Sequence, residues 1–160
     1  VFKEAVVMQM TLPGAPTVYY GDEAGVCGFT DPDNRRTYPW GHEDKELIDF
    51  HKAAIKMHKE NEVLRTGSYK QLYSAHNVIA YGRFTSDDAV IVVVNNGEDE
   101  IRVNIPAWET GLAMDDDVEQ IMVTFEGGYS TDRQGYRLKD GILNIGLRKT
   151  SATVLRRLRW

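Results

Sequence analysis

The sequence is poor in cysteine, in long apolar runs and in positive charge. Its single cysteine, Cys27, cannot form an intrachain disulfide or by itself build a structural zinc site. No apolar run approaches the roughly 20 residues that a transmembrane helix needs. Lys and Arg number 19 against 24 Asp and Glu, a net charge of −5, which argues against nucleic-acid binding through clustered cations. The lone cysteine slightly favours a cytoplasmic protein, although nothing in the sequence fixes the location.

The remaining composition is that of a globular protein with enough apolar residues for a sizeable core. Apolar residues make up 42% and charged residues 27% of the 160 positions. The chain opens on Val1, with neither a start methionine nor a basic-then-apolar signal segment. We interpret this opening as a cut inside a longer protein.

The pattern of residues changes near position 65, and the part before it is typical of helices and loops. Residues 2–10 have an apolar face at helical spacing and predict a short helix. The β-branched and aromatic run Thr17–Tyr20 predicts a buried strand. Residues 21–41 hold four glycines and two prolines, which predicts a long loop; loops of that length without regular structure are usually functional or disordered.

A second helix is expected at about 43–60. Leu47, Phe50, Ala54 and Met57 fall on one stripe and predict a broad buried face. We expect this face to pack on the rest of the chain or on a second copy of it, because an exposed patch of that size drives association.

The same helix carries two histidines, His51 and His58, seven residues apart. A zinc pair on one helix needs spacing of four residues. The spacing therefore favours two partly buried histidines that form hydrogen bonds over a metal site.

From Thr66 onward the period of hydrophobicity falls to two, which is typical of strands. The run 89–94 is apolar throughout and predicts a central strand. Turn residues at 95–97 and 139–141 offer hairpin chemistry. About eight short strands predict an antiparallel sandwich or barrel. The expected strands are 67–73, 77–85, 89–95, 100–105, 119–125, 134–139, 141–147 and 151–158.

The stretch 13–40 carries most of the potential chemistry. Asp31 and Arg35 are close enough in sequence to point into one site, where a carboxylate and a guanidinium could bind sugar hydroxyls. Tyr38 and Trp40 add flat apolar surface that could stack on a pyranose ring. The alternative is an Asp–Arg ion pair that pins the loop, with Trp40 in the core. Composition alone favours this alternative.

The exact order of residues in this stretch favours the sugar-binding interpretation instead. Tyr-Tyr-Gly-Asp-Glu at 19–23, followed by Asp-Pro-Asp-Asn-Arg-Arg at 31–36, resembles the α-amylase family, glycoside hydrolase family thirteen. The segment is similar to the family's last (β/α)₈-barrel strand and the loop after it, in the neopullulanase, cyclomaltodextrinase and maltogenic amylase branch. The later helix and Leu64-Arg-Thr-Gly-Ser-Tyr69 are similar to the eighth barrel helix and its junction with a C-terminal β-sandwich.

The resemblance implies roles for particular residues. Asp31 and Arg35 would contact glucose units on the non-reducing side of the cleavage point. Gly21, Asp22 and Glu23 would shape the floor of the site. Retaining glycosidases need two carboxylates about 5–5.5 Å apart, and the resemblance places these groups before Val1. We therefore assign no catalytic residue, no metal ligand and no cofactor, and we expect this portion alone to be inactive.

The fold expected from these observations is mainly β, in two parts. Residues 1–65 would be the remnant of a truncated (β/α)₈ barrel, with strand eight, a substrate loop and helix eight. Residues 66–160 would be an independently folding antiparallel Greek-key β-sandwich that stabilises the enzyme. The expected partners are an α-glucan oligosaccharide and the rest of the barrel, with no nucleic acid and no membrane.

The alternative from another class is a non-catalytic carbohydrate-binding or interaction module. Such a module would carry a row of exposed aromatics on one sandwich face, whereas the aromatic residues after 65 are scattered along the sequence. This distribution disfavours the alternative.

Three other features predict no site. The acidic run Asp115–Glu119 lacks the spaced ligands and glycine of a calcium loop, which favours a solvated loop. Arg156, Arg157 and Arg159 form a basic cluster for which surface salt bridges are expected. Cys27 has no nearby histidine in the sequence, which argues against a nucleophile.

Overall fold

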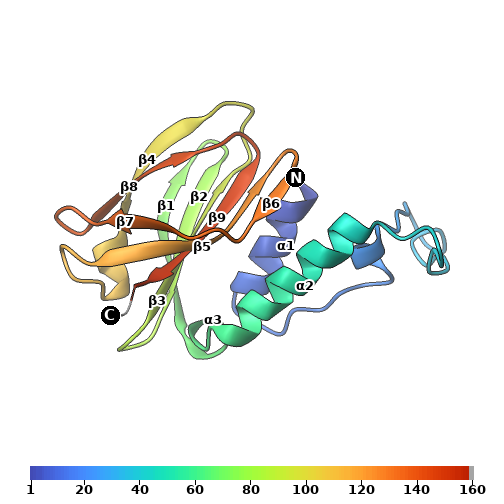
Figure 1. The fold of residues 1–160 in the computed structure, drawn as a ribbon, viewed down its shortest axis with the longest axis horizontal. Helices are drawn as coiled ribbons and strands as arrows, with labels where there is room; N and C mark the ends of the chain where they lie inside the picture. Colours follow the sequence, from blue (N-terminus) through green and yellow to red (C-terminus); the bar gives the residue numbers. More distant parts are fainter. Residues whose placement is uncertain (159–160) are drawn as a thin grey trace.

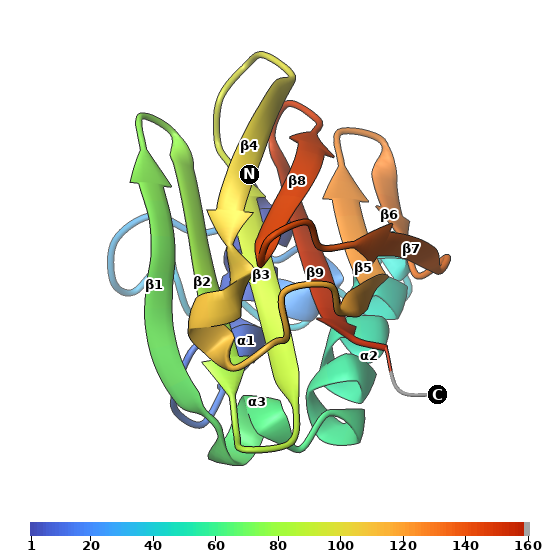
Figure 2. The same ribbon diagram turned by 90° about the vertical axis from the view of Figure 1, so that its left-hand side faces the viewer.

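The chain folds into three stacked layers (Figure 1). In the computed structural model, which describes residues 1–158, helices form one outer layer and a large antiparallel sheet the middle layer. A two-stranded sheet covers the opposite face of the large sheet, as the turned view shows (Figure 2). The fold is thus mainly β, an antiparallel sandwich with helices added on one side.

The helical layer confirms both helices expected from the sequence. It consists of α1 (Phe2–Thr11), the 3₁₀ turn η1 (Asp22–Ala24), α2 (Lys45–Glu60) and α3 (Val63–Thr66). Asp44 caps α2, because its side chain accepts a hydrogen bond from the Leu47 N–H at 2.9 Å. Within residues 1–158 no helix is both long and apolar enough to cross a bilayer.

The strands follow closely the ranges expected from the period of two. They are β1 (Ser68–Ala75), β2 (Val78–Phe84), β3 (Ala89–Asn95), β4 (Ile101–Pro106), β5 (Asp117–Phe125), β6 (Gly128–Ser130), β7 (Gln134–Arg137), β8 (Ile142–Leu147) and β9 (Ser151–Arg157). A short 3₁₀ turn, η2 (Ala107–Thr110), follows β4. Only β6, three residues long, has no counterpart in the expected set.

The large sheet has the strand order β1-β2-β3-β9-β5-β6, and β7 also pairs with β5. The small sheet pairs β4 with β8. The turn at 95–97 is therefore not a hairpin, because it carries the chain from the large sheet to the small one. The turn at 139–141 also joins the two sheets, but it closes as a two-residue hairpin turn: Lys139 and Ile142 exchange N–H···O hydrogen bonds at 3.1 and 2.9 Å, and Asp140 and Gly141 both have positive φ. At the first turn the buried Asn95 side chain bonds the carbonyls of Asp99 and Arg148, both at 2.9 Å, and directs the chain out of the sheet.

The middle sheet is buried on both faces, which explains why residues 89–94 are apolar throughout. Alternate residues of a strand point to opposite faces, and β3 contributes to two separate cores. Val90, Val92 and Val94 face the helices, whereas Ala89, Ile91 and Val93 face β4 and β8. The prediction of a central strand here is confirmed.

Two side chains of β2 hold the helical layer to the sheet. The guanidinium of Arg83 is buried and donates to the carbonyls of Thr11, Leu64 and Gly67, each at 2.8 Å. The Tyr81 hydroxyl lies 2.6 Å from the Thr11 hydroxyl. Because Thr11 is the last residue of α1 and Gly67 follows α3, these hydrogen bonds tie the ends of both helices to β2.

The prediction of a strand at Thr17–Tyr20 is wrong. These residues have no regular structure, and the Thr17 carbonyl accepts from the Gln9 side chain at 2.6 Å. A strand needs a neighbouring strand to supply its hydrogen bonds, and none of the strands described lies beside this segment.

Candidate functional site

The loop between α1 and α2 carries every residue that the sequence singled out for substrate binding. Its outer part projects away from the three layers (Figure 1). At its base, η1 packs against α2, the Asp44 N–H donates to the Ala24 carbonyl at 3.1 Å, and Ala24 is buried. The loop is thus anchored at its base and open at its tip.

Asp31 and Arg35 form an ion pair on this loop, as the alternative interpretation expected. Arg35 Nη2 lies 2.7 Å from one oxygen of Asp31 and 2.8 Å from the other. The side chains are 64% and 48% exposed for Asp31 and Arg35, respectively. Arg35 uses a single nitrogen for this pair, so that most of its five N–H donors face solvent. The arrangement can donate to and accept from a neutral polar ligand.

A second ion pair, Asp33 with Arg36, lies beside the first and was not singled out in the sequence. Arg36 donates from Nε to Oδ1 of Asp33 at 2.9 Å and from Nη2 to both oxygens at 2.7 and 2.9 Å. The Phe29 N–H also donates to Asp33, at 3.2 Å. These hydrogen bonds, chiefly those from Arg36, hold the pKa of Asp33 below its usual value. The spacing of three residues between opposite charges was the available signal.

The aromatic residues of the loop lie at the protein surface. Trp40 is 80% exposed, which rules out its placement in the core. Its ring centroid lies 4.7 Å from that of Tyr38, in a tilted arrangement. Gly21 packs against Tyr38, since a Cβ on Gly21 would lie 3.4 Å from that ring. One face of the Trp40 indole is thus available to a planar or ring-shaped ligand.

Gly21, Asp22 and Glu23 lie together at the base of the loop. Gly21 adopts the left-handed conformation, with φ of 83°, and caps η1, which contains Asp22 and Glu23. Asp22 lines a small cavity between α1 and α2 that His51 also lines. Tyr38 contacts Gly21 and connects it to the outer part of the loop.

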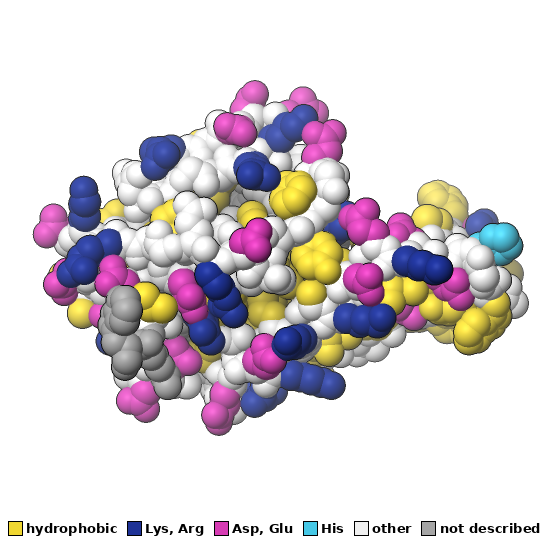
Figure 3. Space-filling model, in the orientation of Figure 1, with side chains coloured by type: hydrophobic (Ala, Val, Ile, Leu, Met, Phe, Trp, Pro, Cys, Tyr) yellow, Lys and Arg dark blue, Asp and Glu magenta, His cyan; other side chains and the backbone are white. Residues whose placement is uncertain are grey.

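Large apolar side chains gather on the same segment. Figure 3 shows hydrophobic atoms concentrated on the projection, in contrast to the mixed charges over the sheets. The exposed members are Val18, Tyr19, Tyr20, Phe29 and Trp40. Exposed apolar patches of this kind mark surfaces that another molecule or domain covers.

The two histidines of α2 form hydrogen bonds, as expected. His51 Nδ1 lies 2.9 Å from the Leu47 carbonyl and His58 Nδ1 lies 2.7 Å from the Met10 carbonyl. Within residues 1–158 no cluster of three His, Cys, Asp or Glu side chains is arranged to hold a metal ion.

The acidic run 115–119 is paired with arginines. Asp116 binds Arg157 at 3.0 Å, Glu119 binds Arg156 at 2.7 Å, and Arg137 binds Asp115. The salt bridges expected for Arg156 and Arg157 are present, whereas Arg159 lies outside the described residues. Cys27 is exposed, and its thiol donates to the Gly25 carbonyl at 3.5 Å.

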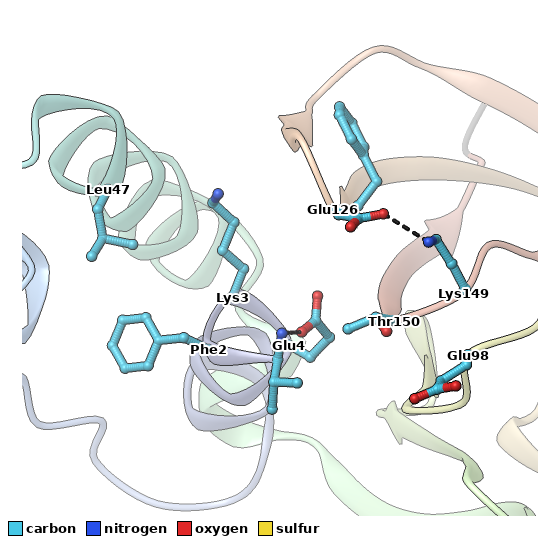
Figure 4. Close-up of a pocket in the computed structure, with 10 residues that line it drawn as sticks. Phe2, Lys3, Glu4, Leu47, Glu98, Glu126, Lys149 and Thr150 are labelled. Atoms are coloured by element: carbon cyan, nitrogen blue, oxygen red, sulfur yellow. Dashed lines mark ion pairs between the residues drawn. The ribbon is translucent and has the colours of Figure 1, made fainter.

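A cavity lies between the start of α1, α2 and the turns at the ends of the strands that hold Glu98, Glu126 and Lys149 (Figure 4). Both lysines that line it form ion pairs: Lys149 binds Glu126, which also lines the cavity, and Lys3 binds Glu46 beside it, both at 2.9 Å. The first pair lowers the pKa of Glu126 and raises that of Lys149. Its lysines are already paired with carboxylates, so the loop is the stronger candidate site.

No protein-family model matches the chain. Curated proteins do match it in part. An amylopullulanase of Thermoanaerobacter thermohydrosulfuricus is 45% identical over 107 residues, which is 60% of this chain and 7% of that protein. A cyclomaltodextrinase of Thermoanaerobacter pseudethanolicus is 43% identical over 96 residues, which is 59% of this chain and 17% of that protein. The chain thus spans a small share of the length of these relatives.

Solved structures share the fold. The α-amylase from Geobacillus thermoleovorans, in complex with acarbose, superposes with a TM-score of 0.84 over 99% of this chain and 33% of that one, at 24% identity. A cyclomaltodextrinase superposes with a TM-score of 0.71 over 95% of this chain and 25% of that one, at 26% identity. The helices and both sheets therefore recur together in these larger enzymes.

Proposed function

We propose that this chain, which resembles the C-terminal part of α-amylase-family enzymes of the neopullulanase and cyclomaltodextrinase branch, is a portion of a retaining α-glucan glycoside hydrolase. In this proposal residues 1–65 are the end of the (β/α)₈ catalytic barrel and residues 66–160 are the β-sandwich that follows it. The end of α3 at Thr66 and the start of β1 at Ser68 support a boundary within a few residues of this position.

The observation that carries the proposal is the exposed Asp31–Arg35 pair on its anchored loop. A guanidinium with unused donors beside a carboxylate matches the hydroxyl pairs of a sugar, which both donate and accept. Trp40 adds a flat apolar surface for the ring. In barrels of this class the loops that follow the strands build the active site, and Asp31 and Arg35 would bind glucose units there.

The exposed apolar residues of the loop support a larger protein. The ring centroids of Tyr19 and Tyr20 lie 4.8 Å apart in a tilted arrangement, and both side chains are about half exposed. In the proposed enzyme the rest of the barrel covers them, and Gly21, Asp22 and Glu23 form part of the floor of its site. The barrel also supplies the acid and the nucleophile, so that this portion contributes substrate binding and stability and carries no catalytic residue.

The decisive experiment is kinetic and uses the longer enzyme. Arg35→Ala removes a charge-assisted hydrogen bond worth roughly 1.5–3 kcal/mol, so kcat/KM on cyclomaltodextrin should fall about 10- to 100-fold. Asp31→Ala should cause a similar loss, and the double variant should lose less than the sum, because the two residues act as a unit.

A matched control is Lys52→Ala, which breaks an exposed ion pair with Asp49 on α2 and should leave kcat/KM unchanged. No loss for either loop variant would reduce Asp31 and Arg35 to an ion pair that holds the loop. A loss of about 10⁵ would instead put Arg35 in the catalytic machinery.

The chain by itself should not hydrolyse starch or cyclomaltodextrin, because protonation of a leaving group needs a positioned acid. Turnover that survives repurification and disappears in Glu23→Gln would overturn the assignment.

A non-catalytic carbohydrate-binding module is not favoured. In the described part of the sandwich, Tyr69 and Trp108 are the exposed aromatics, and they lie on different elements, β1 and η2. They do not form the row of rings that binds a polysaccharide chain.

A further inference from the structure

We infer that Asp33 and Arg36 are positioning residues, which hold the turn that presents Asp31 and Arg35 to the substrate. That the bound molecule is a substrate rests on the proposed function. The positioning role itself is argued from the geometry of residues 28–36. The four charged side chains form two interleaved pairs, 31 with 35 and 33 with 36.

The two pairs differ in how fully their hydrogen-bonding groups are used. Both oxygens of Asp33 are occupied, by three contacts from Arg36 and one from the Phe29 N–H. Asp31 receives only Arg35 Nη2 among the described donors. Asp33 is thus engaged within the loop, whereas the Asp31–Arg35 pair keeps capacity for a ligand.

The Asp33 carboxylate joins the two sides of the turn. It links the backbone at Phe29, before the turn, to the side chain of Arg36, after it. Between them the Asp33 N–H donates to the Thr30 carbonyl at 2.8 Å, and the Arg35 N–H donates to the Pro32 carbonyl at 3.0 Å. Asp31 and Arg35 therefore lie inside a closed loop of hydrogen bonds.

The backbone is close-packed at the same point. A Cβ on Gly28 would lie 2.5 Å from the Asn34 Cα and 2.6 Å from the Asp33 carbonyl oxygen. The two sides of the turn touch, and a shift of the Asp33–Arg36 clamp must move Arg35, its sequence neighbour.

The clamp should matter for position and little for global stability. Exposed ion pairs contribute about 0–1 kcal/mol to folding, and the side chains of Asp33 and Arg36 are both about half exposed. Substrate binding is sensitive to displacements of about 1 Å, so that a loosened turn weakens binding even where the fold is intact.

The first test uses this chain and is independent of any enzyme activity. Asp33→Asn and Arg36→Lys should each speed hydrogen exchange in residues 28–36 by about tenfold or more. Asp33→Asn removes the charged acceptor of the Phe29 N–H, and Arg36→Lys removes the forked N–H donors of the Asp33 carboxylate. The melting temperature should stay within about 2 °C. Asp49→Asn, which weakens an exposed ion pair of the same spacing on α2, should leave exchange in 28–36 unchanged. Unchanged exchange in both loop variants overturns the inference.

The second test uses the longer enzyme with cyclomaltodextrin as the probe. Arg36→Lys and Asp33→Asn should raise KM about 3- to 10-fold with little change in kcat, because both act through residues that bind substrate away from the reacting atoms. If Arg35→Ala lowers kcat/KM while Arg36→Lys leaves KM unchanged, the positioning role is wrong and the proposed function stands. If Arg35→Ala itself has no effect, the proposed function fails.

Discussion

Phe50 offers the sharpest test of whether the helical layer and the sandwich form one folding unit. Its side chain is fully buried in the core between the helices and the large sheet, with its ring 5.2 Å from that of Tyr129. From sequence alone we expect residues 66–160 to fold independently. The shared core predicts instead that both parts unfold together, because the helices cover an entire apolar face of the sheet.

The expected magnitude follows from the burial. Phe50→Ala removes a fully buried ring and leaves a cavity, which costs about 3–5 kcal/mol. For a chain of this size, that corresponds to a fall of roughly 6–20 °C in melting temperature. Phe29→Ala is the matched control: the same substitution at a ring that is 88% exposed should change stability by less than about 0.5 kcal/mol.

The assay is thermal and urea unfolding followed by two probes, the helical signal in far-ultraviolet circular dichroism and amide exchange in β3. One unit predicts a single transition that shifts by the same amount with both probes. A helical transition that moves while the β3 transition keeps its midpoint would refute the reasoning. A chain of residues 66–160 that melts as the whole chain does would refute it as well.

Three further predictions follow from single buried features. Burial raises the pKa of Tyr81 to about 12 from 10.0, so stability should fall by about 2–3 kcal/mol as the pH rises from 10 to 12, and Tyr81→Phe should remove this dependence in titrations of unfolding free energy. Arg83→Met leaves three buried carbonyls without a donor and should cost about 3–5 kcal/mol in urea unfolding. Gly141→Ala places a Cβ 2.7 Å from that of Trp108 at a φ of 75° and should cost about 2–4 kcal/mol, whereas Gly135→Ala, with open space around it, tests the same change without the clash.

Much of the candidate site could be predicted from the sequence, because its residues are close together in the chain. Asp31 and Arg35 are four residues apart, and one turn brings their side chains within 2.7 Å. The clamp of Asp33 and Arg36 was missed, since two adjacent arginines and two nearby aspartates allow more than one pairing. The exposure of Trp40 was also undetermined, because an aromatic residue after a proline suits a core and an open loop equally well.

Within the main helices and the central strand, the sequence by itself determined which residues share a buried face and with what period. The helical stripe through Phe50 and the apolar run 89–94 both specify local structure, since the backbone of each element dictates which side chains share a face. Only the tertiary structure decided what lies against those faces. It left Thr17–Tyr20 without a partner strand, sent the turn at 95–97 from one sheet to the other, and buried Arg83 where three distant carbonyls converge. These outcomes depend on hydrogen-bond partners far away in the sequence, and a local pattern of hydrophobicity does not specify those partners.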